Sequence, residues 1–141
     1  MTNNSPVIII DDDVDDHDFV RDVWTELGFR NKLIFFTTAD ELLSYLEADS
    51  PTPFLVLCDV NLPSMNGFEL RKKLLENPNP KGRSVPFIFW SNAASEEQVR
   101  KAYDLSVHGF FIKQSSYEKL KDAFNKIMQY WFLNQQPENI K

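Results

Sequence analysis

Five polar residues stand where short apolar runs of the sequence end. Asp11 and Asp12 follow the run VIII, Asp59 follows LVLC, Ser91 follows FIFW and Lys113 follows FFI. Such runs are typical of strands buried in a parallel sheet. Ligands of open parallel sheets bind just outside the carboxyl ends of the strands. We therefore expect these five side chains to share one edge of a sheet.

The chemistry that suits this set is phosphoryl transfer beside a divalent metal ion. Crowded carboxylates repel one another unless a cation neutralises them. Mg²⁺ takes hard oxygen ligands of this kind, and Mn²⁺ would fit similarly. Asp59 could then attack phosphorus as a carboxylate nucleophile and form an acyl phosphate. The Lys113 ammonium and the Ser91 hydroxyl would stabilise the charge on the transferred group.

Other polar residues have simpler interpretations. One group of acids opens a helical pattern, where negative charge is favourable, and we leave it out of the site. This group is Asp13, Asp15, Asp16 and Asp18. His17 and His108 have no partner pattern for a metal or a triad, which favours surface or packing roles. Cys58, the only cysteine, lies inside an apolar run and is expected to pack in the core.

The elements that must position this set alternate between strand and helix. Strands are expected at residues 7–10, 32–38, 54–58, 85–90 and 109–112. Helices are expected at about 15–27, 39–46, 68–76, 96–103 and 116–131, with capping pairs that begin at Thr38, Ser95 and Ser115. Residues 77–84, rich in Asn, Pro and Gly, are expected to form a long exposed turn.

This order predicts an α/β fold with a five-stranded parallel sheet, right-handed crossovers and five helices on its two faces. The last helix carries an apolar stripe that favours core packing over a partner groove. That stripe is Leu120, Phe124, Ile127, Met128 and Trp131. The chain of 141 residues is most simply one domain. We place the domain at residues 1–134 and a polar C-terminal tail at 135–141.

Composition excludes several classes of function. The formal net charge of -6 gives no basic footprint for nucleic acid. No apolar run approaches the length of about 20 residues that spans a bilayer. The N-terminal residues MTNNSP lack the pattern of a signal peptide, so we expect a cytoplasmic protein.

Over about residues 7–131 the chain resembles the response-regulator receiver domain of two-component signalling, and the stand-alone, chemotaxis-type regulators in particular. The matching pieces are IIIDDD, VLCDVNLPSMNG, FIFWSNA and GFFIK, which occur in the order and at the spacing of that family. The resemblance implies a flavodoxin-like, doubly wound sheet with strand order 2-1-3-4-5.

The resemblance also implies roles for individual residues. Asp59 would accept a phosphoryl group from a sensor histidine kinase or a phosphotransfer protein. Asp12 and Asp59 would bind Mg²⁺ together with the main-chain carbonyl of Asn61, and Asp11 would act mainly through water. Ser91 would move toward the phosphoryl group and Phe110 would turn inward.

The movement of Ser91 and Phe110 would remodel the surface formed by the fourth predicted helix, the fifth strand and the fifth predicted helix. This would alter binding to a downstream protein. The protein would act as a monomer or weak homodimer and catalyse only its own phosphoryl transfer and dephosphorylation. Two residues depart from the family pattern. Gln114 follows Lys113 where a proline, often cis, is usual, and Asn92 replaces a smaller residue after Ser91.

Two alternatives remain open from the sequence. A receiver that has lost phosphotransfer would serve as a constitutive docking module. A small phosphatase of the haloacid-dehalogenase type would use Asp11-Asp12-Asp13-Val14 as its nucleophile motif, but the further acidic pair that such enzymes need is missing after later strands.

Overall fold

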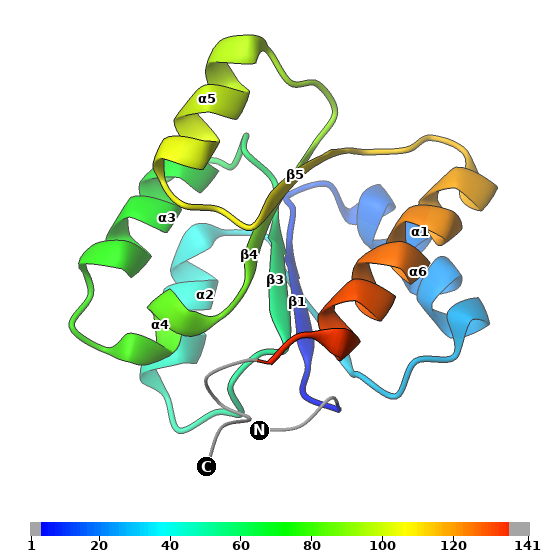
Figure 1. Cartoon of the computed structure of the whole chain (residues 1–141), viewed down its shortest axis with the longest axis horizontal. Helices are drawn as coiled ribbons and strands as arrows, with labels where there is room; N and C mark the ends of the chain where they lie inside the picture. The colour runs from blue at the N-terminus through cyan, green and yellow to red at the C-terminus, as the bar shows by residue number, and fades with distance from the viewer. Residues whose placement is uncertain (1–3, 136–141) are drawn as a thin grey trace.

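The structure is a computed structural model that describes residues 4–135 of the chain. Its centre is a parallel sheet of β1 (Val7–Ile10), β2 (Leu33–Phe36), β3 (Leu55–Cys58), β4 (Phe87–Ser91) and β5 (Gly109–Ile112). The strands lie in the order β2-β1-β3-β4-β5, with β2 and β5 at the edges. Figure 1 shows β1, β3, β4 and β5 in this arrangement. The predicted flavodoxin-like sheet and its strand order are confirmed. The predicted tail lies outside the described residues except for its first residue.

Six helices cover the two faces of the sheet in this part of the chain. On one face lie α1 (Val14–Leu27) and α6 (Tyr117–Leu133), which contact each other. On the other face lie α2 (Ala39–Glu47), α3 (Gly67–Glu76), α4 (Pro80–Ser84) and α5 (Glu96–Asp104). No helix within residues 4–135 is long and apolar enough to cross a membrane.

Both faces of the central strands are buried, which is why their sequences are continuous apolar runs. Successive side chains of a strand point to opposite faces. The core under α2 to α5 receives Ile8, Ile10, Val56, Cys58, Phe87 and Phe89. The core under α1 and α6 receives Val7, Ile9, Leu55, Leu57, Ile88 and Trp90. Cys58 is a buried core residue, as expected.

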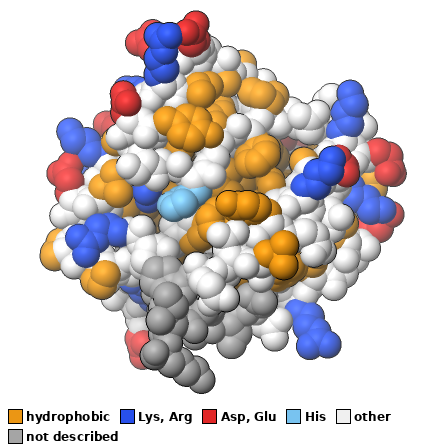
Figure 2. Space-filling model, in the orientation of Figure 1, with side chains coloured by type: hydrophobic (Ala, Val, Ile, Leu, Met, Phe, Trp, Pro, Cys, Tyr) orange, Lys and Arg blue, Asp and Glu red, His pale blue; other side chains and the backbone are white. Residues whose placement is uncertain are grey.

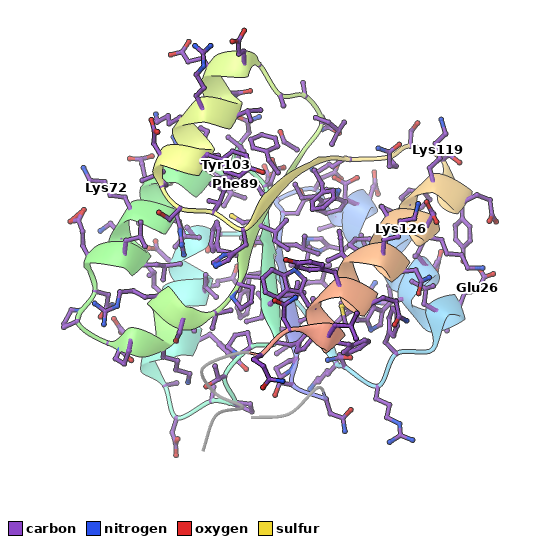
Figure 3. All side chains as sticks on the ribbon, viewed as in Figure 1. Glu26, Lys72, Phe89, Tyr103, Lys119 and Lys126 are labelled. Atoms are coloured by element: carbon purple, nitrogen blue, oxygen red, sulfur yellow. The ribbon has the colours of Figure 1, made fainter. Side chains whose placement is uncertain are left out.

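The apolar stripe of α6 packs in the core, as its spacing predicts. Leu120, Phe124, Ile127 and Met128 are buried, and the half-buried Trp131 packs against them. On the outside, Glu26 of α1 lies beside α6 (Figure 3) and accepts hydrogen bonds from the Tyr117 hydroxyl and from Lys121 Nζ. These contacts hold the C-terminal end of α1 against the N-terminal part of α6.

Two local predictions are wrong. Residues 77–84 are not a continuous turn, because Pro80–Ser84 forms the short helix α4. Its Gly82 is buried beside Leu74 and Leu46. The cap of α6 is Ser116 and not Ser115, since the Ser116 hydroxyl accepts from the Lys119 N–H at 3.4 Å. The predicted capping boxes at Thr38 and Ser95 are confirmed.

The strand register places the polar residues side by side. Ile10 of β1 pairs with Cys58 of β3, so Asp11 and Asp59 both come directly after the last paired residues. Ser91 ends β4 and pairs with Ile112, which precedes Lys113. The main chain continues this order, because the Asp59 N–H donates to the Ile10 carbonyl at 2.9 Å and the Lys113 N–H donates to the Ser91 carbonyl at 2.7 Å.

Gly67, at the start of α3, allows this helix to approach the end of β3 closely. Its N–H donates to the Val60 carbonyl at 2.9 Å. A Cβ at this position would lie 2.7 Å from the Asp59 carbonyl oxygen and 2.8 Å from Cε1 of Phe89. The main chain of Asp59 therefore depends on a glycine eight positions later.

We predict that Gly67→Ala lowers the free energy of unfolding by about 1–3 kcal/mol, the usual cost of overpacking. The backbone of Gly67 is not in the left-handed region, so the methyl group would act through its contacts with Asp59 and Phe89. Urea unfolding followed by circular dichroism measures the change.

Gly28 provides the matched control, because it has a φ of 71° and no neighbour within 4 Å of an added Cβ. Gly28→Asn should be tolerated better than Gly28→Ala, since asparagine adopts the left-handed conformation more readily. Gly67→Asn should be no better than Gly67→Ala. An unfolding free energy of Gly67→Ala within about 0.5 kcal/mol of the unmodified chain would contradict the steric account.

Candidate functional site

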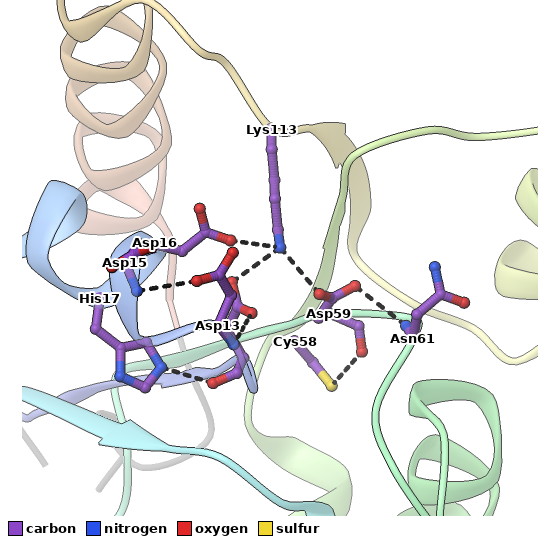
Figure 4. A network of polar contacts seen from close by, with 9 residues as sticks. Asp13, Asp15, Asp16, His17, Cys58, Asp59, Asn61 and Lys113 are labelled. Carbon is purple, nitrogen blue, oxygen red and sulfur yellow. Dashed lines mark hydrogen bonds and ion pairs between the residues drawn. The ribbon is translucent and has the colours of Figure 1, made fainter.

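The Lys113 ammonium is the centre of the polar site at the carboxyl ends of the strands. Its Nζ atom lies 2.9 Å from Oδ2 of Asp11, 2.9 Å from Oδ2 of Asp16 and 2.9 Å from Oδ2 of Asp59 (Figure 4). The Lys113 side chain is only 6% exposed, and those of Asp11 and Asp59 are 0% and 8% exposed. These are buried ion pairs, in which removal of one partner leaves an uncompensated charge.

Main-chain N–H groups orient the two buried carboxylates. Asp11 Oδ1 accepts from the Asp13 N–H at 3.0 Å, and Asp59 Oδ1 accepts from the Asn61 N–H at 3.1 Å. Each carboxylate therefore has one oxygen on the main chain and the other on Lys113. This arrangement fixes the orientation of the Asp59 carboxylate. A group that acts as a nucleophile needs a fixed orientation of this kind.

Burial and charge pairing compete at this site. Burial raises the pKa of Asp11 to about 7, although Lys113 and the Asp13 N–H both favour the charged carboxylate. Burial acts to lower the pKa of Lys113, but its bonds to Asp11, Asp59 and Asp16 outweigh this effect and leave the pKa above the usual value. Lys113 therefore remains a cation.

The residues present fit a divalent cation. Carboxylate oxygens of Asp11, Asp12 and Asp59 lie within 4.8 Å of one another, and Asp12 is exposed. The peptide N–H of Asn61 already contacts Asp59, so the main chain of this residue borders the same acids. Oxygen donors with access to solvent are the ligands that Mg²⁺ and Mn²⁺ take in proteins.

Ser91 and Phe110 lie on the opposite side of the strand ends from Asp16. Ser91 is fully buried, and its Oγ has no hydrogen-bond partner among the described residues. A buried hydroxyl without a partner is unusual and calls for an explanation. Phe110 is half-buried and packs against Phe89, with ring centroids 5.9 Å apart. The structure therefore places a free donor and a partly covered aromatic ring next to each other along β4 and β5.

Asp16 contacts the site residues, although its sequence pattern predicts only a place at the start of a helix. Its carboxylate is 27% exposed and pairs with Lys113. Asp13 does act as the predicted cap, because its side chain accepts from the Asp15 N–H at 2.9 Å. With Asp13 as the cap, Asp16 stands at the third position of α1, where its side chain returns toward the sheet edge. The position of the Asp13 cap is the sequence feature that could have placed Asp16 beside the site.

His17 and Cys58 contact main-chain carbonyl groups of the two buried acids. His17 Nε2 lies 2.6 Å from the Asp11 carbonyl oxygen, and its ring stacks on Phe35. Cys58 donates from Sγ to the Asp59 carbonyl at 3.2 Å. Neither side chain is aimed at the carboxylates, so both support the main chain of the acids, in agreement with the packing roles expected for them.

A pocket of about 320 Å³ opens beside Lys113. Its lining residues are Asp15, Asp16, Phe19, Trp90, Asn92, Lys113, Gln114 and Ser115. The peptide bond between Lys113 and Gln114, where the family usually has a proline that is often cis, is trans. Asn92, the second departure from the family pattern, lies in the wall of this pocket. A ligand could reach Lys113 from this side.

Solved structures share this fold. The phosphorylated cyanobacterial phytochrome response regulator RcpA has a TM-score of 0.81 at 20% identity, over 95% of this chain and 98% of that chain. The Mn²⁺-bound form of the response regulator Rcp1 has a TM-score of 0.79 at 24% identity, over 94% of this chain and 99% of that chain.

Sequence comparison also finds relatives among response regulators and chemotaxis proteins. The chain is 27% identical to the chemotaxis protein CheY-3 of Vibrio cholerae over 130 residues, which is 92% of this chain and 95% of the relative. It is 24% identical to the response regulator Rcp1 of Synechocystis sp., over 89% of this chain and 87% of the relative. The family model for the response regulator receiver domain matches residues 7–125. The chain therefore belongs to the response regulator receiver domain family.

Proposed function

We propose that this receiver domain is a phosphoacceptor that takes a phosphoryl group on Asp59 in a Mg²⁺-dependent reaction. The proposal rests on the contacts that the two oxygens of the Asp59 carboxylate make. One oxygen is held by the Asn61 N–H, the other by the Lys113 ammonium, and a cation-binding set of acids lies beside it. A carboxylate in this setting is suited to attack phosphorus and to have its product charge neutralised.

The donor would be a phosphohistidine of a histidine kinase or a phosphotransfer protein. A carboxylate oxygen of Asp59 forms a bond to phosphorus, while the bond from phosphorus to the imidazole nitrogen breaks and its electron pair stays on the imidazole. Lys113 pairs with a phosphoryl oxygen during this exchange. Ser91, whose buried Oγ has no partner among the described residues, donates a hydrogen bond to another phosphoryl oxygen.

The side chains of Asp11, Asp12 and Asp59 and the main-chain carbonyl of Asn61 would hold the metal ion. A bound divalent cation neutralises the acids and the phosphoryl oxygens, so that like charges can approach one another. The Mn²⁺-bound relative Rcp1 supports a divalent site of this type. Mg²⁺ is our choice for this chain because the donors are all oxygen, and Mn²⁺ is an acceptable substitute.

The output would be a change in protein binding on the face formed by α5, β5 and α6. The part of this face next to α6 carries a groove of about 280 Å³, lined mainly by residues of β4, β5 and α6. Figure 2 shows apolar side chains around a histidine on this side of the molecule. The residues that line the groove are Ile88, His108, Phe111, Lys126, Ile127, Tyr130 and Trp131. Movement of Ser91 toward the phosphoryl group would free space beside β5, and Phe110 would respond by turning inward.

Two observations argue against the alternatives. In a phosphatase of the haloacid-dehalogenase type, Asp13 would be a catalytic residue of the nucleophile motif. Here its carboxylate caps α1 instead. A docking module without phosphotransfer would have no need for Asp11, Asp59 and Lys113 to form buried ion pairs, which are costly to bury. We therefore treat residues 1–134 as one phosphoaccepting domain.

The central prediction is that acetyl phosphate and Mg²⁺ add one phosphoryl group to the chain. The mass of the intact protein should rise by one phosphoryl group, and chelation of the metal should prevent the gain. Asp59→Asn, which keeps the size of the side chain but removes the nucleophile, should gain nothing. Equal gains in Asp59→Asn and in the unmodified chain would disprove the assignment.

A second prediction concerns the exposed ligand. Asp12→Ala should reduce Mg²⁺ affinity about tenfold or more, the loss expected for one charged oxygen contact. Because Asp12 is exposed, the free energy of unfolding without metal should change by less than about 0.5 kcal/mol. Calorimetric titration with MgCl₂ measures the affinity. Asp18→Ala, outside the acid cluster and paired with Arg21, is the control and should bind Mg²⁺ normally.

A third prediction tests the electrostatics. In the absence of metal, Lys113→Met should lower the free energy of unfolding by about 3 kcal/mol, because three carboxylates lose their shared cation. Saturating Mg²⁺ should stabilise this variant more than it stabilises the unmodified chain. Thermal unfolding with and without MgCl₂ provides the comparison.

Lys126→Met is the matched control for this measurement. Lys126 pairs with Asp122 at 2.8 Å, but both side chains are more than half exposed. Its replacement should cost about 1 kcal/mol or less and should not change the effect of Mg²⁺. Equal stabilisation of Lys113→Met and the unmodified chain by Mg²⁺ would show that the metal and the ammonium do not share these acids.

A further inference from the structure

Trp90 is an aromatic residue in the wall of the site. The phosphoacceptor chemistry described above gives this residue no role. It precedes Ser91 on β4 and is 4% exposed. The centroid of its ring lies 4.9 Å from the Lys113 ammonium nitrogen. A cation at this distance from an indole face is attracted by the ring, and the attraction is larger where water is excluded.

The strand register explains why these two side chains meet. Trp90 pairs with Phe111 of β5, so Lys113 stands two residues beyond its partner. Side chains two residues apart on a strand share a face. Trp90 belongs to the core under α1 and α6, and Lys113 extends over the same face toward Asp16 of α1. The contact is therefore a product of the sheet geometry.

The ring and the acids contact the ammonium group in different ways. Lys113 Nζ donates hydrogen bonds to Asp16 and Asp59 at 2.9 Å each and forms an ion pair with Asp11 at the same distance. The indole face needs no N–H, so it can hold the same ammonium without displacing an acid. Trp90 is itself fixed from behind by Phe124 of α6, with ring centroids 6.0 Å apart.

The exchange of partners at Asp59 gives this contact a use. While a phosphoryl group forms on Asp59, one N–H of Lys113 must leave the carboxylate and pair with a phosphoryl oxygen. The cation–π attraction does not depend on which N–H points where, so it persists while that bond changes. Trp90 and Lys113 both line the pocket that also contains Asn92 and Gln114.

We propose that Trp90 is a positioning residue for Lys113, whose indole face holds the ammonium at the acid cluster while its bond to Asp59 is exchanged for a bond to the phosphoryl group. This role rests on the proposed function of Asp59. It concerns a different residue and a different interaction, so the two can be tested separately.

The kinetic test compares an aromatic with an apolar replacement at the same position. Trp90→Phe keeps a π face, whereas Trp90→Met and Trp90→Leu fill the space without one. With acetyl phosphate and Mg²⁺, Trp90→Phe should be phosphorylated within about threefold of the unmodified rate, and Trp90→Met about tenfold more slowly. Equal slowing of the aromatic and apolar variants would overturn the proposal.

A double-mutant comparison separates positioning from general damage to the core. In a Lys113→Met background, Trp90→Met and Trp90→Phe should have the same rate, because the cation is gone. A persistent tenfold difference in that background would assign a merely structural role to Trp90. Trp24→Phe, which alters a tryptophan that also packs on Phe124 but contacts no ammonium, should leave the rate within about twofold.

A spectroscopic readout decides the geometry without any phosphorylation. The ε-methylene protons of Lys113, identified by their loss in Lys113→Met, should be shifted upfield by the Trp90 ring current. They should return to ordinary positions in Trp90→Met, or in Trp90→Leu if the methionine variant does not fold. Unshifted protons in the unmodified chain would overturn the proposal. Failure of the chain to accept a phosphoryl group, with the shift present, would instead count against Asp59 as the acceptor.

Discussion

The site depends on one ammonium group that is shared by three carboxylates. Lys113 reaches from the end of β5 to Asp11 after β1, Asp59 after β3 and Asp16 on α1, with 2.9 Å to each. Like charges this close repel strongly where water is excluded. The cation therefore makes the arrangement possible, and it also links four elements of the fold to one another. A receiver site and a stable sheet edge are here the same set of contacts.

Much of this arrangement is predictable, because a parallel sheet brings all its strand ends to one edge. Short apolar runs define the strands, and a candidate site residue follows four of the five runs, the exception being the run that forms β2. This reasoning predicts Asp11, Asp59, Ser91 and Lys113 together, and the register of the strands confirms their neighbourhood. The capping boxes at the starts of α2 and α5 are equally local, so short sequence patterns suffice for them as well.

Features that depend on contacts between distant elements could not be predicted in this way. Asp16 looked like one of several acids at a helix start, and only the exact position of the Asp13 cap turns it toward Lys113. Arg71 is 2% exposed and donates to the carbonyls of Leu105 and Ser106 at the end of α5. A charged residue in a helix is normally expected at the surface. The short helix α4 was hidden for a similar reason, since prolines and glycines favour a turn.

We propose that the Asp59 carboxylate is the acceptor of the phosphoryl group. Borohydride reduces an acyl phosphate to an alcohol, so it marks the modified residue permanently. After treatment of the chain with acetyl phosphate and Mg²⁺, reduction and peptide mass spectrometry should locate the reduced residue at position 59 and nowhere else. A reduced residue at Asp11, Asp12 or Asp16, or a phosphorylated chain without any reducible group, would contradict the account.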